Sequence, residues 1–326
     1  MAQITNLRME KRVDSELSLA ARAAWLHHAG GLTQSQVAKR LGVNNLKAHR
    51  LISRANQEGL VKVFIDGDIT ECLELEQRIS DHYGLDQCEV IPEFDDDDLP
   101  LHALGTAGAA FLRRVVDSSA YNTVGVGHGR TLAACIDKLP GKTRCDTRFV
   151  SLLGGLTRNF SANPHDVIHR LAQRTGAPAF VMPVPFFANT VEDREVLLQQ
   201  RGIHEVFELA RQSDLKLVGI GTTEQHASLV ATGMIEQTEI EHIAEQGGVG
   251  ELLGHFFDAG GTPIETALSN RTMSVPLADL EDSSIVAVAG GRFKVAAIRS
   301  VLNSRYLSGL VTDERTARAL VTDVKT

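Results

Sequence analysis

The sequence lacks the features that would place it in several common classes of protein. No segment approaches the roughly 20 consecutive apolar residues of a membrane-spanning helix, and the first 16 residues show no apolar core of a secretory signal. The four cysteines include no CxxC pair, so we expect reduced thiols that serve in packing. No P-loop motif and no convincing GxGxxG motif opens a strand–helix unit. We therefore expect a cytoplasmic protein with no cofactor, metal or membrane segment.

Charge is distributed unevenly along the chain of 326 residues, which is long enough for two domains. Residues 1–65 contain ten Lys and Arg residues against four acids, a net charge of +6. The remainder contains 23 against 37, a net charge of −14. A basic head on an acidic body is typical of a protein that places one end against nucleic acid, although chance clustering is the alternative. We expect a DNA-binding domain at residues 1–66 and a second domain at 67–326.

The basic head contains two predicted helices before a tight turn. Leu17–Ala29 is rich in helix formers, and Gly30-Gly31 ends it. Thr33 begins the second helix and can form a capping box with Gln36. The inward side of that helix would be formed by Val37, Ala38 and Leu41.

A third helix follows the turn at Gly42-Val43. Asn44 is a suitable N-cap for Asn45–Glu58, and Gly59 closes the helix. Its inward side is predicted to be Leu46, Leu51, Ile52 and Ala55. Two short helices joined by a Gly-containing turn are typical of a helix-turn-helix, whose second helix enters the DNA major groove. The alternative is a helical hairpin packed on the body.

The candidate DNA contacts are polar residues at the starts of the second and third predicted helices, and on the outer side of the third helix. Asn and Arg can bond base edges in pairs of hydrogen bonds, and Lys and Arg neutralise phosphates. These candidates are Thr33, Gln34, Asn44, Asn45, Lys47, His49, Arg50 and Arg54. Residues 60–65 are predicted to form a strand, which could be a wing with Lys62 against DNA or a ribbon at the domain edge.

The acidic body alternates short apolar strands with helices, which predicts a parallel α/β sheet. Helices are expected at Leu73–Tyr83 and Leu101–Val116. The expected strands are Glu89–Ile91, Thr123–Val126, Phe149–Leu153, Ala179–Met182, Leu215–Ile220, Ile285–Ala289 and Leu310–Thr312. Such sheets bind ligands beyond the carboxyl ends of their strands.

Glycine-rich loops follow four of these strands. They begin at Gly127, Gly154, Gly221 and Gly290, and three of them contain Arg or Lys. Glycines let backbone N–H groups approach an anion, and a cation balances its charge. The pattern favours a small polar or phosphorylated ligand, the alternative being that the glycines serve only the turns. The candidate effector-binding residues are Gly127, His128, Gly129, Arg130, Thr131, Gly155, Leu156, Thr157, Arg158, Asn159, Gly221, Thr222, Asp258 and Lys294.

Several further residues have two interpretations. His165 and His169, four apart on a predicted helix, could bind a metal, but a polar pocket wall is favoured. Asp258 could accept hydrogen bonds from ligand hydroxyls or form a turn before Gly-Gly. Further expectations are core or pocket-rim positions for Phe186 and Phe187, polyol contacts for Arg194 and Glu195, and a solvated loop at Asp95–Asp98.

The motifs resemble the SorC family of sugar-responsive bacterial regulators over nearly the whole chain, from about Ala20 to Leu320. The markers are residues 33–42 (TQSQVAKRLG), 127–132 (GHGRTL), 153–155 (LGG), 247–251 (GGVGE), 288–291 (VAGG) with Lys294, and 310–314 (LVTDE). Residues 154–163 and 181–194 are most similar to the branch that regulates erythritol catabolism. The family commonly has Trp at the position of His128 and Ser at that of Asn44.

The resemblance implies a winged helix-turn-helix head and a Rossmann-like effector domain with the phosphosugar-isomerase-like fold. It also implies a homodimer or homotetramer on a palindromic operator, controlled by a sugar, sugar phosphate or polyol. The Gly127–Thr131 and Gly154–Arg158 loops and Lys294 would line the effector pocket. We therefore expect a ligand-responsive regulator, a repressor of a sugar or polyol catabolic operon, and not an enzyme. The alternatives are a sugar-phosphate isomerase or deaminase with an accessory head, and a structural DNA-binding protein without a ligand.

Overall fold

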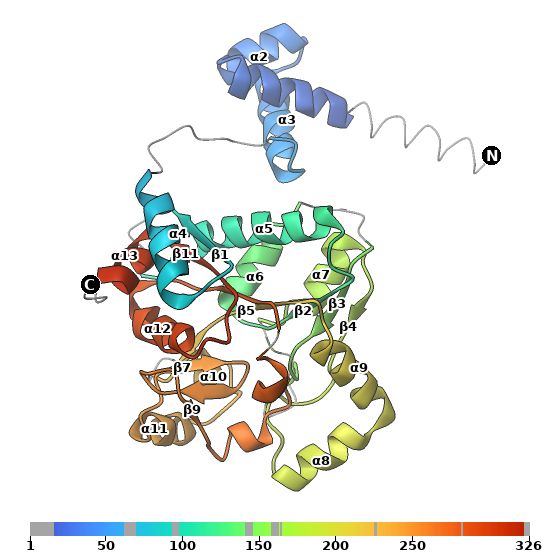
Figure 1. Cartoon of the computed structure of the whole chain (residues 1–326). Helices are drawn as coiled ribbons and strands as arrows, with labels where there is room; N and C mark the ends of the chain where they lie inside the picture. Colours follow the sequence, from blue (N-terminus) through green and yellow to red (C-terminus); the bar gives the residue numbers. More distant parts are fainter. Residues whose placement is uncertain are drawn as a thin grey trace, which may run out of the picture. The chain divides into compact units, whose positions relative to one another are not determined.

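The computed structural model describes residues 16–61, 70–92, 98–140, 146–157, 163, 165–224, 227–281 and 283–322. The chain divides into two compact units, Met1–Gly67 and Asp68–Thr326 (Figure 1). Each unit has its own hydrophobic core. No helix of the described residues is long and apolar enough to span a membrane.

The head contains three helical segments, as the capping residues predict. A helix over residues 16–24 continues into the π-helix η1 (Trp25–Ala29), and α2 (Gln34–Leu41) and α3 (Asn45–Gln57) follow. The capping box is confirmed, since Thr33 N donates to Gln36 Oε1 at 2.9 Å and Gln36 N to Thr33 Oγ1 at 3.4 Å. Asn44 Oδ1 accepts from Lys47 N at 2.8 Å and so caps α3.

The turn between α2 and α3 is as predicted, whereas the strand predicted at the end of the head is not seen in its described residues. Gly42 has a φ of 66°, a left-handed conformation that glycine adopts without steric cost, and this lets α3 begin three residues later. In the predicted strand at residues 60–65, Leu60 and Val61 are not in a strand. The remaining four residues, with Lys62, lie outside the described residues.

The prediction that Leu46 faces inward is wrong. The buried side of α3 is formed by Ala48, Leu51, Ile52 and Ala55, which pack against the other two helices. Successive residues of a helix are rotated by about 100°, which places Leu46 on the opposite side. Its side chain is 59% exposed.

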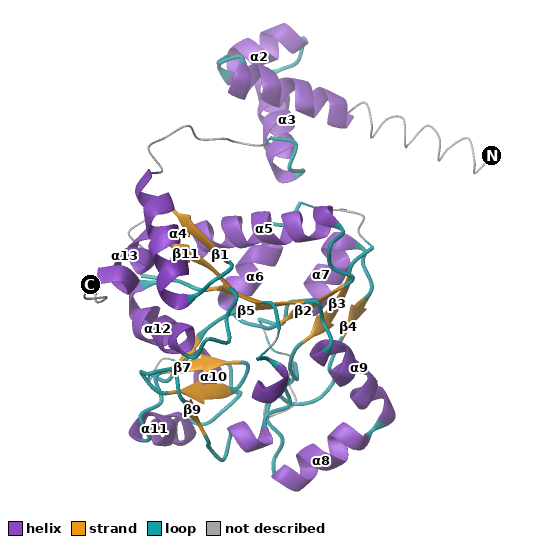
Figure 2. Ribbon diagram, in the orientation of Figure 1, coloured by secondary structure: helices purple, strands orange, loops and turns teal. Residues whose placement is uncertain are grey.

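The second unit is built on a seven-stranded parallel sheet with the order β1-β11-β10-β5-β2-β3-β4 (Figure 2). All seven predicted strands are confirmed within about two residues at each end. The strands are β1 (Gln87–Ile91), β2 (Thr123–Val126), β3 (Arg148–Ser151), β4 (Ala179–Phe180), β5 (Leu215–Val218), β10 (Ile285–Val288) and β11 (Gly309–Asp313).

Both faces of this sheet are covered by helices, as parallel sheets require. Alternate residues of β10 face opposite cores: Val286 and Val288 join one cluster, and Ile285 and Ala287 the other. The first core includes residues of α5 (Leu101–Ser118), α6 (Arg130–Asp137) and α7 (Ile168–Thr175). The second includes residues of α4 (Thr70–Tyr83), α9 (Arg201–Arg211), α11 (Gln237–Glu245), α12 (Val295–Asn303) and α13 (Glu314–Thr322). The remaining helices of this unit are α8 (Val191–Gln199), α10 (Ser228–Ala231), η2 (Ser269–Arg271), η3 (Leu277–Asp279) and η4 (Arg292–Lys294).

A small antiparallel sheet was not predicted. Its order is β6-β7-β8-β9, with β6 (Gly221–Thr222), β7 (Gly250–Leu252), β8 (His255–Phe257) and β9 (Pro263–Ile264). Strands of two or three residues are too short to show alternation in a sequence. Leu253 and Gly254 join β7 to β8 with φ angles of 52° and 81°, a turn that requires positive φ at both central residues.

Candidate effector pocket and DNA-contact helix

A cavity lies beyond the carboxyl ends of β2 and β5, where the topology of a parallel sheet predicts a ligand site. Its volume is about 60 Å³, room for several water molecules or one small polar ligand. Strand-end loops of the large sheet form one wall, and α10 and β7 form the other. The lining residues are Gly127, His128, Gly129, Arg130, Thr131, Leu132, Leu153, Asn163, His165, Gly219, Ile220, Gly221, Thr222, Ser228, Leu229, Thr232, Glu251, Leu253 and Lys294.

Lys294 places an ammonium group at this cavity. The residue ends η4, directly before α12, and its Nζ donates to Ile220 O at 2.6 Å. Burial lowers the pKa of Lys294 to about 8, and the nearby Arg130 lowers it further, whereas Glu251 opposes the shift. The ammonium form therefore predominates at neutral pH. Arg130, at the first residue of α6, adds an exposed second cation.

Glu251 places a buried carboxyl group in the same cavity. Its Oε1 accepts from Gly254 N at 2.6 Å, which ties the side chain to the turn after β7. Burial raises the pKa of Glu251 to about 7, although the Gly254 N–H and Lys294 oppose the shift. This group is therefore partly protonated near neutral pH and can both donate and accept hydrogen bonds.

His128 is a neutral wall of the cavity. Asn163 Nδ2 can only donate, and it lies 3.1 Å from His128 Nδ1, so the ring proton is on Nε2. The ring meets the Phe186 ring edge-on, with 5.0 Å between centroids. Burial first, and the nearby His165 second, lower the pKa of His128 to about 4. An uncharged imidazole whose Nε2–H forms no hydrogen bond with the described residues suits a ligand hydroxyl oxygen.

His165 also lines the cavity, which supports the pocket-wall interpretation. Asn163 Oδ1 accepts from His165 N at 2.9 Å, and α7 begins only at Ile168. The expectation that His165 and His169 share a helix is therefore wrong. His169 is exposed, and its Nδ1 lies 3.8 Å from Asp166 Oδ2. Within the described residues no group of three His, Cys, Asp or Glu side chains could hold a metal.

Asp258 does not line this cavity. Its Oδ1 accepts from Thr262 N at 2.8 Å, and its backbone oxygen accepts from Gly261 N at 3.1 Å. These bonds close the connection from β8 to β9, as the turn interpretation predicts, and they hold Asp258 outside the lining of this cavity.

The loop after β3 contributes less to the cavity than expected. Leu153 reaches the lining, but Gly155, Leu156 and Thr157 do not. Thr157 is buried, and Leu156 forms an isolated β-bridge with Pro185. Arg158 and Asn159, like Asp95, Asp96 and Asp97 of the acidic run, lie outside the described residues.

The expected polyol contacts on α8 are also absent from this cavity. Arg194 lines a second cavity of about 320 Å³ beside His255, and its Nε donates to Thr272 O at 2.8 Å. Glu195 is exposed and lines neither cavity. Phe186 and Phe187 are buried in the core. The second cavity is larger, but only the first has the glycine-rich strand ends.

Among the candidate DNA contacts, the structure separates the residues by their hydrogen-bond and ion-pair partners. Arg54 Nη1 bonds Glu16 Oε2 at 2.7 Å, so its charge is compensated inside the head. Lys47 and Arg50 form no ion pair with the described residues and remain exposed. Thr33 and Asn44 act as caps, and His49 Nδ1 lies 3.2 Å from Ser53 Oγ. Gln34 and Asn45 are exposed.

Comparisons with known proteins identify the family of the chain. Residues 67–322 match the family model described as "Putative sugar-binding domain". The chain is 59% identical to the erythritol catabolism regulatory protein EryD of Brucella abortus over 308 residues, which are 94% of this chain and 98% of that protein. The chain belongs to the SorC family of sugar-binding transcriptional regulators.

Other relatives support the membership. The transcriptional regulator LsrR of Klebsiella pneumoniae is 31% identical over 313 residues, 94% of each chain. The crystal structure of the full-length sorbitol operon regulator SorC of Klebsiella pneumoniae has a TM-score of 0.68 and 24% identity, and covers 94% of this chain and 99% of its own. That structure shares the fold. These proteins are transcriptional regulators, so this SorC-family chain is a regulator and the isomerase alternative is set aside.

Sequence reasoning missed four polar groups of this SorC-family cavity: Asn163, Ser228, Thr232 and Glu251. Ser228 and Thr232 lie at the ends of a four-residue helix that has no periodic signal. Glu251 was visible only as part of the GGVGE marker, because its position at the cavity depends on the small sheet. With these residues, the cavity has more hydroxyl, amide and carboxyl groups in its wall than the sequence predicted.

Proposed function

We propose that this SorC-family regulator is a repressor whose effector is a four-carbon polyol or its monophosphate, bound in the 60 Å³ cavity. The observation that carries the proposal is the composition of the cavity wall: two cations, one buried carboxyl group, a neutral imidazole and several hydroxyl and amide groups. The relative named an erythritol catabolism regulatory protein is 59% identical along almost its whole length, which supports the polyol class.

Each kind of group has a matching part of such a ligand. Glu251, Asn163 and His128 can bond the hydroxyl groups that a polyol presents at every carbon. Lys294 and Arg130 can bind a phosphate, together with the N-terminus of α6. A free polyol and its phosphate thus share the hydroxyl contacts and differ at the two cations.

Control of transcription requires that the ligand favours one arrangement of subunits. A ligand with equal affinity for two states cannot shift the balance between them. We propose a homodimer or homotetramer in the cytoplasm that places two copies of α3 in successive major grooves of a palindromic operator. Their separation must match half-sites about one helical turn apart, or a multiple of it. Effector binding would change that separation and release the DNA.

A mobility-shift assay on the DNA upstream of the gene tests the proposal. The full chain should shift this DNA, and erythritol or erythritol 4-phosphate should release it, while a hexitol should not. A chain without residues 1–65 should bind no DNA and should still gain thermal stability with the effector, since the second unit has its own core. DNA binding by the truncated chain, or no response to either ligand, would contradict the proposal.

A further inference from the structure

An exposed leucine lies in the middle of the outer side of α3. The buried side of this helix is centred on Ala48, Leu51, Ile52 and Ala55. With a rotation of about 100° per residue, Leu46 points about 180° from the centre of that side. It is 59% exposed and belongs to the first turn of the helix.

The neighbours of Leu46 are polar on every side. Lys47 and Arg54 follow one flank of the outer side, Asn45 and His49 follow the other, and Arg50 lies one turn further along. The flank with Lys47 and Arg54 borders a hollow of about 390 Å³ that includes Leu46 itself, and the hollow is also lined by Glu16, which pairs with Arg54, and by the buried Leu51. A helix that packed on an apolar partner would surround the leucine with apolar side chains. Amides and two cations without an ion pair to the described residues, Lys47 and Arg50, instead suit nucleic acid.

We propose that Leu46 reads a thymine: its side chain packs on the C5-methyl group of one thymine per half-site and determines operator specificity there. The inference rests on the proposed function, in which α3 enters the major groove. The first residues of such a helix reach base edges. The thymine methyl is the apolar feature that base pairs present in that groove, and leucine has no group that could bond a base edge or a phosphate.

Arg50 limits where this thymine lies. Arg50 is four residues after Leu46, so the two side chains leave the helix about 6 Å apart along its axis. Arg50 carries no ion pair within the described residues and can bond a guanine with two hydrogen bonds. Stacked base pairs are about 3.4 Å apart. The thymine therefore lies within about two base pairs of the base that Arg50 contacts.

Replacement of thymine by deoxyuridine tests this contact, because it removes only the methyl group. Each thymine of the footprinted operator is replaced in turn, in both half-sites, and the Kd of the full-length chain is measured by mobility shift. Loss of one buried methyl contact should raise Kd about fourfold per half-site. We expect this effect at one position near the Arg50 contact.

The variant Leu46→Ala completes the test. It should bind the thymine operator more weakly and be indifferent, within twofold, to deoxyuridine at that position. Leu60→Ala, a second exposed leucine of the head that lies beyond α3, is the matched control and should keep the fourfold effect. Both sites are exposed, and far-UV circular dichroism verifies that both variants fold.

The outcomes are distinct. A deoxyuridine effect that disappears only in Leu46→Ala supports the inference. Operator binding without any deoxyuridine effect, or an effect of equal size in Leu46→Ala, overturns this inference and leaves the proposed function intact. Failure of the wild-type chain to bind any upstream DNA overturns both.

Discussion

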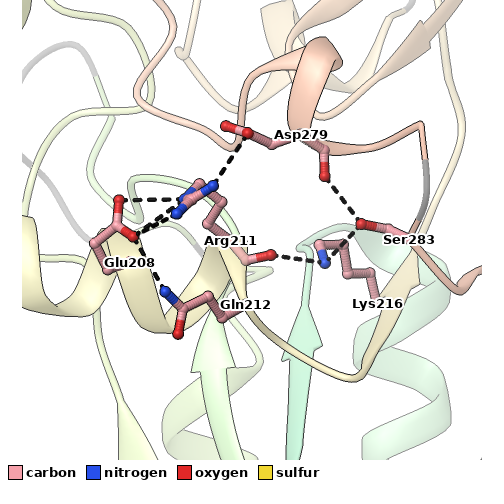
Figure 3. Close-up of polar contacts among 6 residues, drawn as sticks. All are labelled: Glu208, Arg211, Gln212, Lys216, Asp279 and Ser283. Carbon is pink, nitrogen blue, oxygen red and sulfur yellow. Dashed lines mark hydrogen bonds and ion pairs between the residues drawn. The ribbon is translucent and has the colours of Figure 1, made fainter.

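Two lysines, the buried Lys216 and the half-buried Lys294, lie at opposite ends of β5 and its neighbouring strands and show how the same residue type can serve structure or binding. Lys216 lies at the amino end of β5 and is 1% exposed. Its Nζ donates to Arg211 O, Ser213 O and Ser283 Oγ, each at 3.1 Å. Figure 3 shows that Arg211 in turn bonds Glu208 and Asp279. All three N–H bonds of this ammonium group thus have acceptors.

Lys294 lies beyond the carboxyl ends of the strands, and its ammonium group has fewer hydrogen-bond acceptors than that of Lys216. Ile220 O is the one hydrogen-bond acceptor that the described residues provide for it. The remaining N–H bonds face a cavity that also contains Arg130 and Glu251. Burial lowers the pKa of both lysines. A buried ammonium whose donors are satisfied stabilises the fold, whereas one with unused donors at a cavity is available to a ligand.

The largest effect expected from this difference is the loss of the effector response in Lys294→Met. Removing the ammonium that bonds the phosphate should weaken binding of erythritol 4-phosphate about 100-fold, since charged hydrogen-bonded contacts cost about 2–5 kcal/mol to truncate. The free energy of unfolding should change little. Isothermal titration with erythritol and its 4-phosphate measures the affinity, and Lys216→Met is the control. A normal response in Lys294→Met would show that the two lysines do not differ in this way.

The free-energy cost of burying the Glu251 carboxylate at the cavity should be measurable as a dependence of stability on pH. Its folded-state pKa of about 7 exceeds the ordinary value of 4.5. Below pH 4.5 both the folded and the unfolded state hold the proton, so Glu251 costs nothing. As pH rises from 4.5 to 7, only the unfolded state ionises freely, and stability should fall by about 3 kcal/mol.

Glu251→Gln should remove that pH dependence and be more stable than the wild type at pH 8. Urea unfolding of both chains from pH 5 to 8 gives the difference at each pH. His128 acts in the opposite direction, because its lowered pKa makes stability fall as pH drops from 6.5 toward 4. Taking the difference between the two chains cancels this contribution. If the free energy of unfolding changes equally with pH in both chains, the pH dependence does not arise from Glu251.

A smaller effect is expected at the structural lysine. Lys216→Met leaves two buried carbonyls and one hydroxyl without their donor, which should lower the free energy of unfolding by about 2 kcal/mol. Relief from burying the charge offsets part of the loss. Effector affinity should be unchanged, measured by the same titration. A weakened effector response together with normal stability would reverse the roles of the two lysines.

The sequence predicted what local chemistry decides. The Thr33–Gln36 capping box and the Asn44 cap depend on residues three apart, and the buried strands of the large sheet are continuous apolar runs. Lys294 was found for the same reason, because it follows a strand and a glycine pair. Lys216 was not singled out, because its acceptors come from the segment before β5 and from Ser283, far along the chain.

The errors arose where the tertiary arrangement decides. Leu46 was placed inward because it is apolar, although the helical period with Ala48 and Leu51 turns it outward. Asp258 follows an apolar strand, but the small sheet directs that end away from the cavity. Glu251 comes to the cavity from the small sheet, and Asn163 comes from a point nine residues beyond Gly154 in the connection from β3 to α7. The position of these side chains depends on packing between distant segments, which spacing along the chain does not reveal.

The smallest effect, the dependence of effector affinity on pH, distinguishes the free polyol from its phosphate. As pH rises from 6 to 8, Glu251 ionises and becomes a stronger acceptor for hydroxyl groups, so affinity for erythritol should rise about threefold. From pH 7.5 to 9 Lys294, with a pKa of about 8, loses its proton, so affinity for erythritol 4-phosphate should fall about fivefold.

Titrations at both pH ranges, in wild type and Lys216→Met, measure the two profiles. The profiles should coincide in the two chains, because Lys216 faces no ligand; a profile that changes in Lys216→Met would mean that the two ends of the sheet are coupled.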